Sequence, residues 1–100
     1  MDVLPVALKL RGQRCLLIGG GAIARRKARL LRDAGAVLDV LSPEILPELQ
    51  ADVTATGGQY LAERYPCSVD LRIYRVVIAA TDDAAVNAQV FEDCEALNVL

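Results

Sequence analysis

The stretch 14–36 changes from a continuous apolar run to a helical spacing of apolar residues. Residues 15–18 are all apolar, which is the pattern of a strand buried on both faces of a parallel sheet. Three glycines follow at 19–21, and from Ala22 to Ala34 the apolar positions recur along one helical stripe. Gly35 then stands where a helix commonly ends. The pattern predicts a strand, a glycine turn and a helix without a gap.

The rest of the chain alternates in the same way. Residues 36–41 are predicted to form a second strand, parallel to the first because βαβ crossovers are right-handed. Ser42 as N-cap and Pro43 at the first helical position predict a helix through about Ala51. The remaining predicted elements are a lead-in strand within 1–12, an edge strand within 59–65, one helical turn within 67–72, a strand over 74–80, and a helix from 81 to about 96. The apolar stripe of this last helix consists of Val86, Val90, Phe91 and Cys94, with Leu97 after it. Together they predict an α/β Rossmann-like domain with a mostly parallel sheet of about five strands.

The glycine turn carries a dinucleotide-binding pattern. Gly19, Gly21 and Ala24 fit G-x-G-x-x-G/A, in which the first glycine makes the tight turn and the second lets the backbone approach a pyrophosphate. The free amides at the start of the helix, at the positive end of its dipole, would then face the phosphates. The alternative is an ordinary glycine-rich turn between a strand and a helix. The strand and helix around the motif favour a binding site for NAD.

Polar residues follow the second predicted strand, where a Rossmann domain holds the adenosine ribose. Ser42, Pro43 and Glu44 are candidate cofactor-binding residues there, although helix capping explains them equally well. The acid that binds a ribose is expected about 20 residues after the glycines. Asp39 fits that count but lies inside the strand, so Glu44 is the candidate at its end.

Thr81 and Asp82 follow the fourth predicted strand. Together with Asp83 they are typical of the start of a helix, and capping and the helix dipole account for all three without a ligand. Their position at the carboxyl end of a strand in the same sheet also predicts that they border the nicotinamide crevice. Both interpretations can hold together.

The first helix carries five of the 11 positive charges of the chain, and two or three of them lie near its start, where cations oppose the helix dipole. A solvated polar face explains them. The alternative is that Arg25 or Arg26 meets a cofactor phosphate or an acidic substrate.

Composition narrows the functional classes. A hydrophobic content of 54% over 100 residues is sufficient for one small core, and the net charge of −2 gives no reason to expect nucleic acid. No apolar run is long enough for a membrane helix, and the start of the chain does not resemble a signal peptide, which favours the cytoplasm. Three dispersed cysteines without any histidine exclude a histidine-containing zinc site, and no metal site is predicted. A reactive thiol at Cys67 or Cys94 is not favoured, because nothing adjacent would activate it.

Three stretches of the sequence closely resemble the N-terminal domain of siroheme synthases. They are Met1-Asp2 with Leu4-Pro5, the stretch from Ile18 to Ala36 with its G-G-G-x-x-A-x-x-K motif, and Val77 to Asn87 with A-T-D-D. The resemblance covers nearly the whole chain. It implies NAD-dependent oxidation of precorrin-2 to sirohydrochlorin, with iron insertion in bifunctional members, a tetrapyrrole substrate and a homodimeric full-length protein. It also implies that Ala22 and Ile23, and Pro43 and Glu44, line the NAD site.

The chain departs from the family's pattern at its end. Residues 98–100 correspond to the beginning of a fifth strand, after which the family carries an aspartate implicated in both chemistries and a dimerisation region. We therefore assign no catalytic residue, and expect residues 1–100 to be an NAD-binding domain without the dimerisation region or a methyltransferase domain. A non-enzymatic NAD(H)-sensing module is the alternative function. A reductase that uses NADP is a weaker one, because residues 42–44 offer no arginine for a 2′-phosphate.

Overall fold

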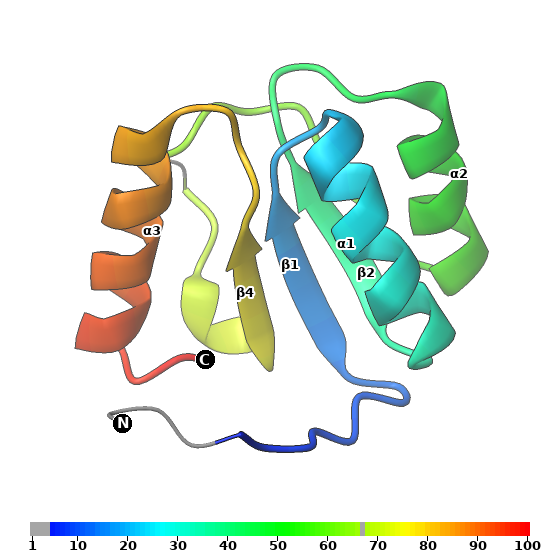
Figure 1. Ribbon diagram of the computed structural model, residues 1–100, viewed down its shortest axis with the longest axis horizontal. Helices are drawn as coiled ribbons and strands as arrows, with labels where there is room; N and C mark the ends of the chain where they lie inside the picture. The colour runs from blue at the N-terminus through cyan, green and yellow to red at the C-terminus, as the bar shows by residue number, and fades with distance from the viewer. Residues whose placement is uncertain (1–4, 67) are drawn as a thin grey trace.

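A computed structural model describes residues 5–66 and 68–100 of the chain. It contains four strands, three α-helices and one 3-10 turn (Figure 1). In chain order these are β1 (Arg14–Ile18), α1 (Ala22–Asp33), β2 (Val37–Leu41), α2 (Pro47–Thr56), β3 (Tyr60–Leu61), η1 (Leu71–Ile73), β4 (Val76–Ala79) and α3 (Ala84–Ala96). The α/β Rossmann-like architecture predicted from the sequence is confirmed.

All pairings in the sheet are parallel, and the strand order is β3-β2-β1-β4. The chain moves outward from β1 through α1 to β2 and then returns to the other side of β1 as β4, so the direction of winding reverses between β1 and β4. Helices α1 and α2 cover one face of the sheet and α3 covers the other (Figure 1). In open α/β sheets such a reversal opens a crevice at the carboxyl ends of the strands.

The central strands are buried on both faces, as their continuous apolar runs require. Cys15 and Leu17 pack in one cluster with Ala24, Ala28 and Leu31 of α1. Leu16 and Ile18 pack in a second cluster on the face covered by α3. Because β1 contributes to both clusters, it fixes the position of the glycines that follow it.

Asp39 is a buried carboxylate in the middle of β2, with 2% of its surface exposed. Arg14 Nη1 lies 2.9 and 2.7 Å from its two oxygens, the Gln59 amide donates to Oδ1 at 2.9 Å, and the Tyr74 hydroxyl donates to Oδ2 at 2.8 Å. These bonds compensate for the burial of the charge. Asp39 therefore links the sheet to its flanking segments and is not the acid for a ribose.

Asp52 is the second buried carboxylate, on α2. It accepts from Arg32 at 2.7 Å and lies 3.3 Å from Arg29 Nε, so it ties α2 to α1. Two of the five cations of α1, Arg29 and Arg32, therefore have a carboxylate partner within the protein.

The second helix does not begin at Ser42 and Pro43, so that prediction is wrong. Helix α2 starts at Pro47, with Leu46 as N-cap. Residues 42–46 instead form a loop that packs on the glycine turn, and the Leu46 amide donates to the Gly20 carbonyl at 3.0 Å. The rule that proline favours the first helical position applies, but to the later of two prolines.

Other departures from the predicted elements are smaller. Residues 5–12 form no strand, residues 1–4 of the predicted lead-in lie outside the described residues, and the edge strand shrinks to Tyr60–Leu61. On α3 the predicted stripe holds for Val90 and Cys94, but Phe91 is 67% exposed and Leu97 43% exposed. In the part of the chain that the structure describes, no helix is long and apolar enough to span a membrane.

Candidate dinucleotide site

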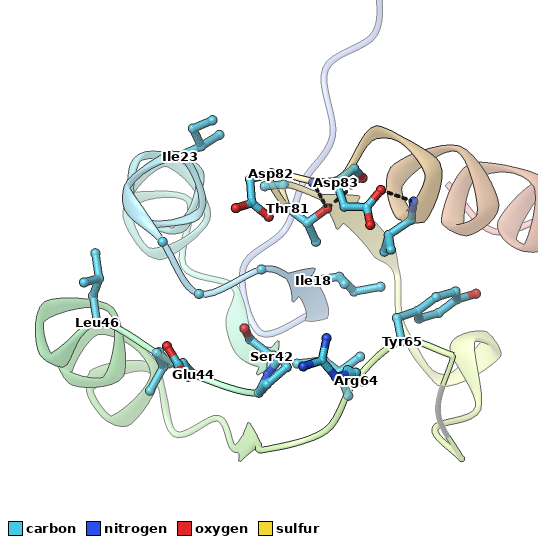
Figure 2. Close-up of a pocket in the computed structure, with 18 of the residues that line it drawn as sticks. Ile18, Ile23, Ser42, Glu44, Leu46, Arg64, Tyr65, Thr81, Asp82 and Asp83 are labelled. Atoms are coloured by element: carbon cyan, nitrogen blue, oxygen red, sulfur yellow. Dashed lines mark hydrogen bonds between the residues drawn. The ribbon is translucent and has the colours of Figure 1, made fainter.

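A cleft of about 770 Å³ lies at the carboxyl ends of the strands, between the starts of α1 and α3 (Figure 2). All nine residues that the sequence nominated for cofactor binding line it: Gly19, Gly21, Ala22, Ile23, Ser42, Pro43, Glu44, Thr81 and Asp82. They come from the ends of three different strands. The parallel topology brings them together, as the sequence motifs anticipated.

The junction between β1 and α1 presents free backbone amides to the cleft. Gly21 is the N-cap of α1, no described side chain caps the helix, and its first turn holds no acidic residue. A Cβ built on Gly21 would meet no described atom within 4 Å, so the space above this backbone is open. An α-helix leaves its first amides without intrahelical partners, and these bind phosphate oxygens well. The junction thus fits the pyrophosphate of a dinucleotide.

Gly19 and Gly20 are required for close packing of the turn. Gly19 has φ +134°, and a Cβ there would lie 2.4 Å from the Ala80 carbonyl oxygen. A Cβ on Gly20 would lie 1.9 Å from the Glu44 carbonyl oxygen. Gly20 occupies an unspecified position of G-x-G-x-x-G/A, and its requirement arises from the 42–46 loop, so the motif did not single it out.

The loop after β2 forms the second wall of the cleft. Its backbone is held by the Tyr60 hydroxyl, which donates to the Ser42 carbonyl at 2.9 Å, and by the bond from Leu46 to Gly20. The Glu44 side chain is exposed and makes no ion pair within the described residues. Its carboxylate is therefore available to a ligand at the end of β2.

The junction between β4 and α3 is closed by its own side chains. Asp83 Oδ1 accepts from the amides of Ala85 at 2.9 Å and Val86 at 3.4 Å, which caps α3. Asn87 Nδ2 donates to the Thr81 carbonyl at 3.1 Å, and Asn87 Oδ1 accepts from the Thr81 amide at 3.2 Å. Thr81 and Asp82 line the cleft. The first amides of α3 are less available to an anion than those of α1, because Asp83 already binds two of them.

Among the lining residues that sequence reasoning missed is a whole segment that follows β3: Glu63, Arg64 and Tyr65. The Tyr65 hydroxyl donates to Asp93 of α3, and together with Gln89 it lowers the pKa of the Asp93 carboxyl. No local motif marks this segment. It reaches the cleft because β3 is only two residues long, and the chain then crosses at the carboxyl ends of the strands toward α3 (Figure 1).

The first-helix cations do not line this cleft. Arg25, Arg26 and Lys27 are exposed on α1, and Arg29 and Arg32 pair with Asp52. Among the described residues no group of histidine, cysteine, aspartate and glutamate side chains could hold a metal ion.

The cysteines offer no activated thiol in the described parts of the chain. Burial raises the pKa of both Cys15 and Cys94, which keeps them protonated at neutral pH. Cys67 lies outside the described residues.

Comparison with curated proteins finds siroheme synthases. The chain is 47% identical over 100 residues to the siroheme synthase of Acinetobacter baylyi, covering 100% of this chain and 22% of that protein. It is 52% identical over 101 residues to the siroheme synthase of Chromobacterium violaceum, covering 100% and 21%. The chain therefore spans about a fifth of the length of these relatives.

Among solved structures, the fold matches one titled "SirC, precorrin-2 dehydrogenase". The TM-score is 0.76 at 28% identity, and the match covers 89% of this chain and 44% of that one. A family model described as "Putative NAD(P)-binding" matches residues 6–100. The predictions of the family, the fold and a nicotinamide dinucleotide cofactor are thus confirmed, and the chain belongs to this NAD(P)-binding family.

Proposed function

We propose that this chain is the dinucleotide-binding domain of an enzyme that oxidises precorrin-2 to sirohydrochlorin with NAD. The observation that carries the proposal is the uncapped start of α1, open above Gly21, in a cleft between the ends of β1 and β4. The printed names of the relatives, siroheme synthase and precorrin-2 dehydrogenase, support the substrate. The same likeness supports a tetrapyrrole ligand, and a homodimer remains our prediction for the full-length protein.

The chain's contribution to this reaction is binding and orientation. The amides after Gly21 would hold the pyrophosphate, Glu44 would accept from the ribose hydroxyls, and Thr81 with Asp82 would border the nicotinamide end. A bound NAD would supply the hydride acceptor for the oxidation, in which the substrate gives up a hydride and a proton, so the products would be sirohydrochlorin, NADH and a proton. Because the cofactor carries this chemistry, no side chain of the domain is assigned as catalytic.

Glu44 favours NAD over NADP. Its free carboxylate stands at the end of β2, where a 2′-phosphate would lie, and the 42–46 loop brings no cation to offset the repulsion. We expect NAD to bind roughly tenfold more tightly than NADP, since a like-charge contact of this kind costs on the order of 1 kcal/mol. The cytoplasm remains our prediction for where the protein acts.

The proposal is tested with the protein as its gene encodes it. Purified protein is mixed with precorrin-2 and NAD, and NADH and sirohydrochlorin are measured together. We expect equal amounts of both from the wild type, and neither from Gly21→Asp, whose carboxylate would occupy the pyrophosphate position. Gly21→Ala, which adds an uncharged methyl group at the same position, should fold like the wild type and lose less turnover than Gly21→Asp. NAD binding without oxidation of precorrin-2 would contradict the enzyme and favour the sensing module.

A further inference from the structure

Arg64 differs from the other charged residues that line the cleft. The others are Glu44, Glu63, Asp82 and Asp83, all of them carboxylates. Within residues 5–66 and 68–100, Arg64 is therefore the single cation of the lining. Its side chain is exposed and has no hydrogen bond or ion pair to any described residue. The other arginines nearest the core, Arg14, Arg29 and Arg32, all have carboxylate partners.

Arg64 lies away from the start of α1, where the pyrophosphate of the cofactor is expected (Figure 2). Figure 2 shows its side chain extending from the segment after β3 toward the middle of the cleft, with Tyr65 on the α3 side and Glu44 toward α1 and α2. The pyrophosphate has the amides after Gly21, and Glu44 marks the ribose end. The cofactor's own anionic groups thus have other partners or stand near a carboxylate.

Binding of an acidic substrate would give the Arg64 guanidinium a carboxylate partner. A tetrapyrrole that carries several carboxylates would enter a cleft lined by four carboxylates and would be repelled by them. A guanidinium can offset that repulsion and hold one substrate carboxylate through two parallel hydrogen bonds. We propose that Arg64 is the substrate-anchoring residue of the cleft and binds a carboxylate of the tetrapyrrole. This inference rests on the proposed function.

The test compares Arg64→Gln and Arg64→Lys with the wild type, in the protein as its gene encodes it. Arg64→Gln should raise the KM for precorrin-2 about tenfold, since a charge-assisted hydrogen bond is lost, with kcat changed less than about twofold. Arg64→Lys keeps the charge without the planar fork and should recover part of that loss. The matched control is Arg75→Gln, which removes an exposed arginine outside the cleft, just before β4.

Binding measurements distinguish the two anions that Arg64 could bind, a carboxylate of the tetrapyrrole and a phosphate of the cofactor. Titration of wild type and Arg64→Gln with uroporphyrin, a stable tetrapyrrole polycarboxylate, should show a weaker affinity in the variant and a loss of most of its salt dependence. Each nucleotide, NAD or NADP, should bind to the variant with the same affinity as it binds to the wild type. A wild type that binds no uroporphyrin, or a variant that weakens nucleotide binding and leaves uroporphyrin binding intact, would overturn the inference.

The outcome is distinguishable from failure of the proposed function. If the wild type fails to oxidise precorrin-2, the proposed function fails whatever Arg64 does. If the wild type oxidises precorrin-2 and Arg64→Gln keeps its KM, the reaction stands and the role of Arg64 is rejected. Circular dichroism on each variant establishes that a change in KM reflects binding, since Arg64 is exposed and its replacement should leave the fold intact.

Discussion

The junction between β1 and α1 and the junction between β4 and α3 meet at the centre of the sheet. They have the same architecture but differ in whether a side chain caps the helix. Each follows a parallel strand and opens a helix, and they touch where Gly19 lies against the Ala80 carbonyl. At α1 the N-cap is a glycine without a capping bond from any described side chain, whereas at α3 Asp83 binds two amides of its own helix. The free start of α1 can accept an external anion, and the closed start of α3 supplies a fixed wall.

The largest effect is expected from adding a side chain at Gly20, where the junction between β1 and α1 packs against the 42–46 loop. Gly20→Ala puts a methyl group 1.9 Å from the backbone oxygen of Glu44, so the 42–46 loop must move. We expect a loss of about 3 kcal/mol in the free energy of unfolding, measured by urea titration. The matched variant Gly21→Ala meets no described atom and should stay within about 1 kcal/mol of the wild type. Equal stability of the two variants would mean that the loop does not pack on the turn.

A smaller effect is expected from opening the second junction. Asp83→Ala removes the acceptor of the Ala85 and Val86 amides and should cost about 1 kcal/mol in the free energy of unfolding. Because Asp83 is committed to its own helix, NAD affinity measured by calorimetry should stay within about threefold of the wild type. A severe loss of NAD affinity would contradict the division of roles between the junctions.

The smallest effect concerns the contact between the cleft and α3. The Tyr65 hydroxyl helps to lower the pKa of Asp93, so this contact stabilises the fold above the unfolded pKa of about 4 and is lost as the pH falls through the lowered folded value. Tyr65→Phe should therefore destabilise the protein at pH 7, and its difference from the wild type should shrink as the pH falls below about 4. Tyr60→Phe, which removes a bond to a carbonyl, is the control. Its effect should not change over this range, and a parallel pH profile for both variants would reject the assignment.

Much of this site could be predicted from the sequence because its parts are local. The strand, the glycines and the helix occupy adjacent residues, and the parallel topology then brings Thr81 and Glu44 to the same edge of the sheet. Capping of α3 by Asp83 is likewise a contact of two to three residues. Such features depend on spacing and residue type, which the sequence states directly.

The remaining features depend on contacts between distant segments. The requirement at Gly20 comes from residue 44, and Arg64 reaches the cleft because β3 ends after two residues. The start of α2 was misplaced because Pro43 and Pro47 both satisfy the local rule, and packing of the loop on Gly20 decides between them. Asp39 matches the spacing expected of a ribose acid, but its place inside the predicted strand already argued against that role, and in the structure Arg14 and Tyr74 hold it in the core.

The most direct measurement transfers the chemistry of the second junction to the first. Gly21 has an extended backbone, φ −98° and ψ −162°, which an aspartate adopts without strain, so the carboxylate of Gly21→Asp can reach the first amides of α1 and cap the helix. Calorimetric titration with NAD and thermal unfolding are made on the wild type and on this variant. We expect a melting temperature equal to or above that of the wild type, because the new carboxylate caps α1, and an NAD affinity reduced at least about 100-fold, because the amides are occupied. A folded Gly21→Asp variant that binds NAD as tightly as the wild type would contradict the assignment of the cofactor site to α1.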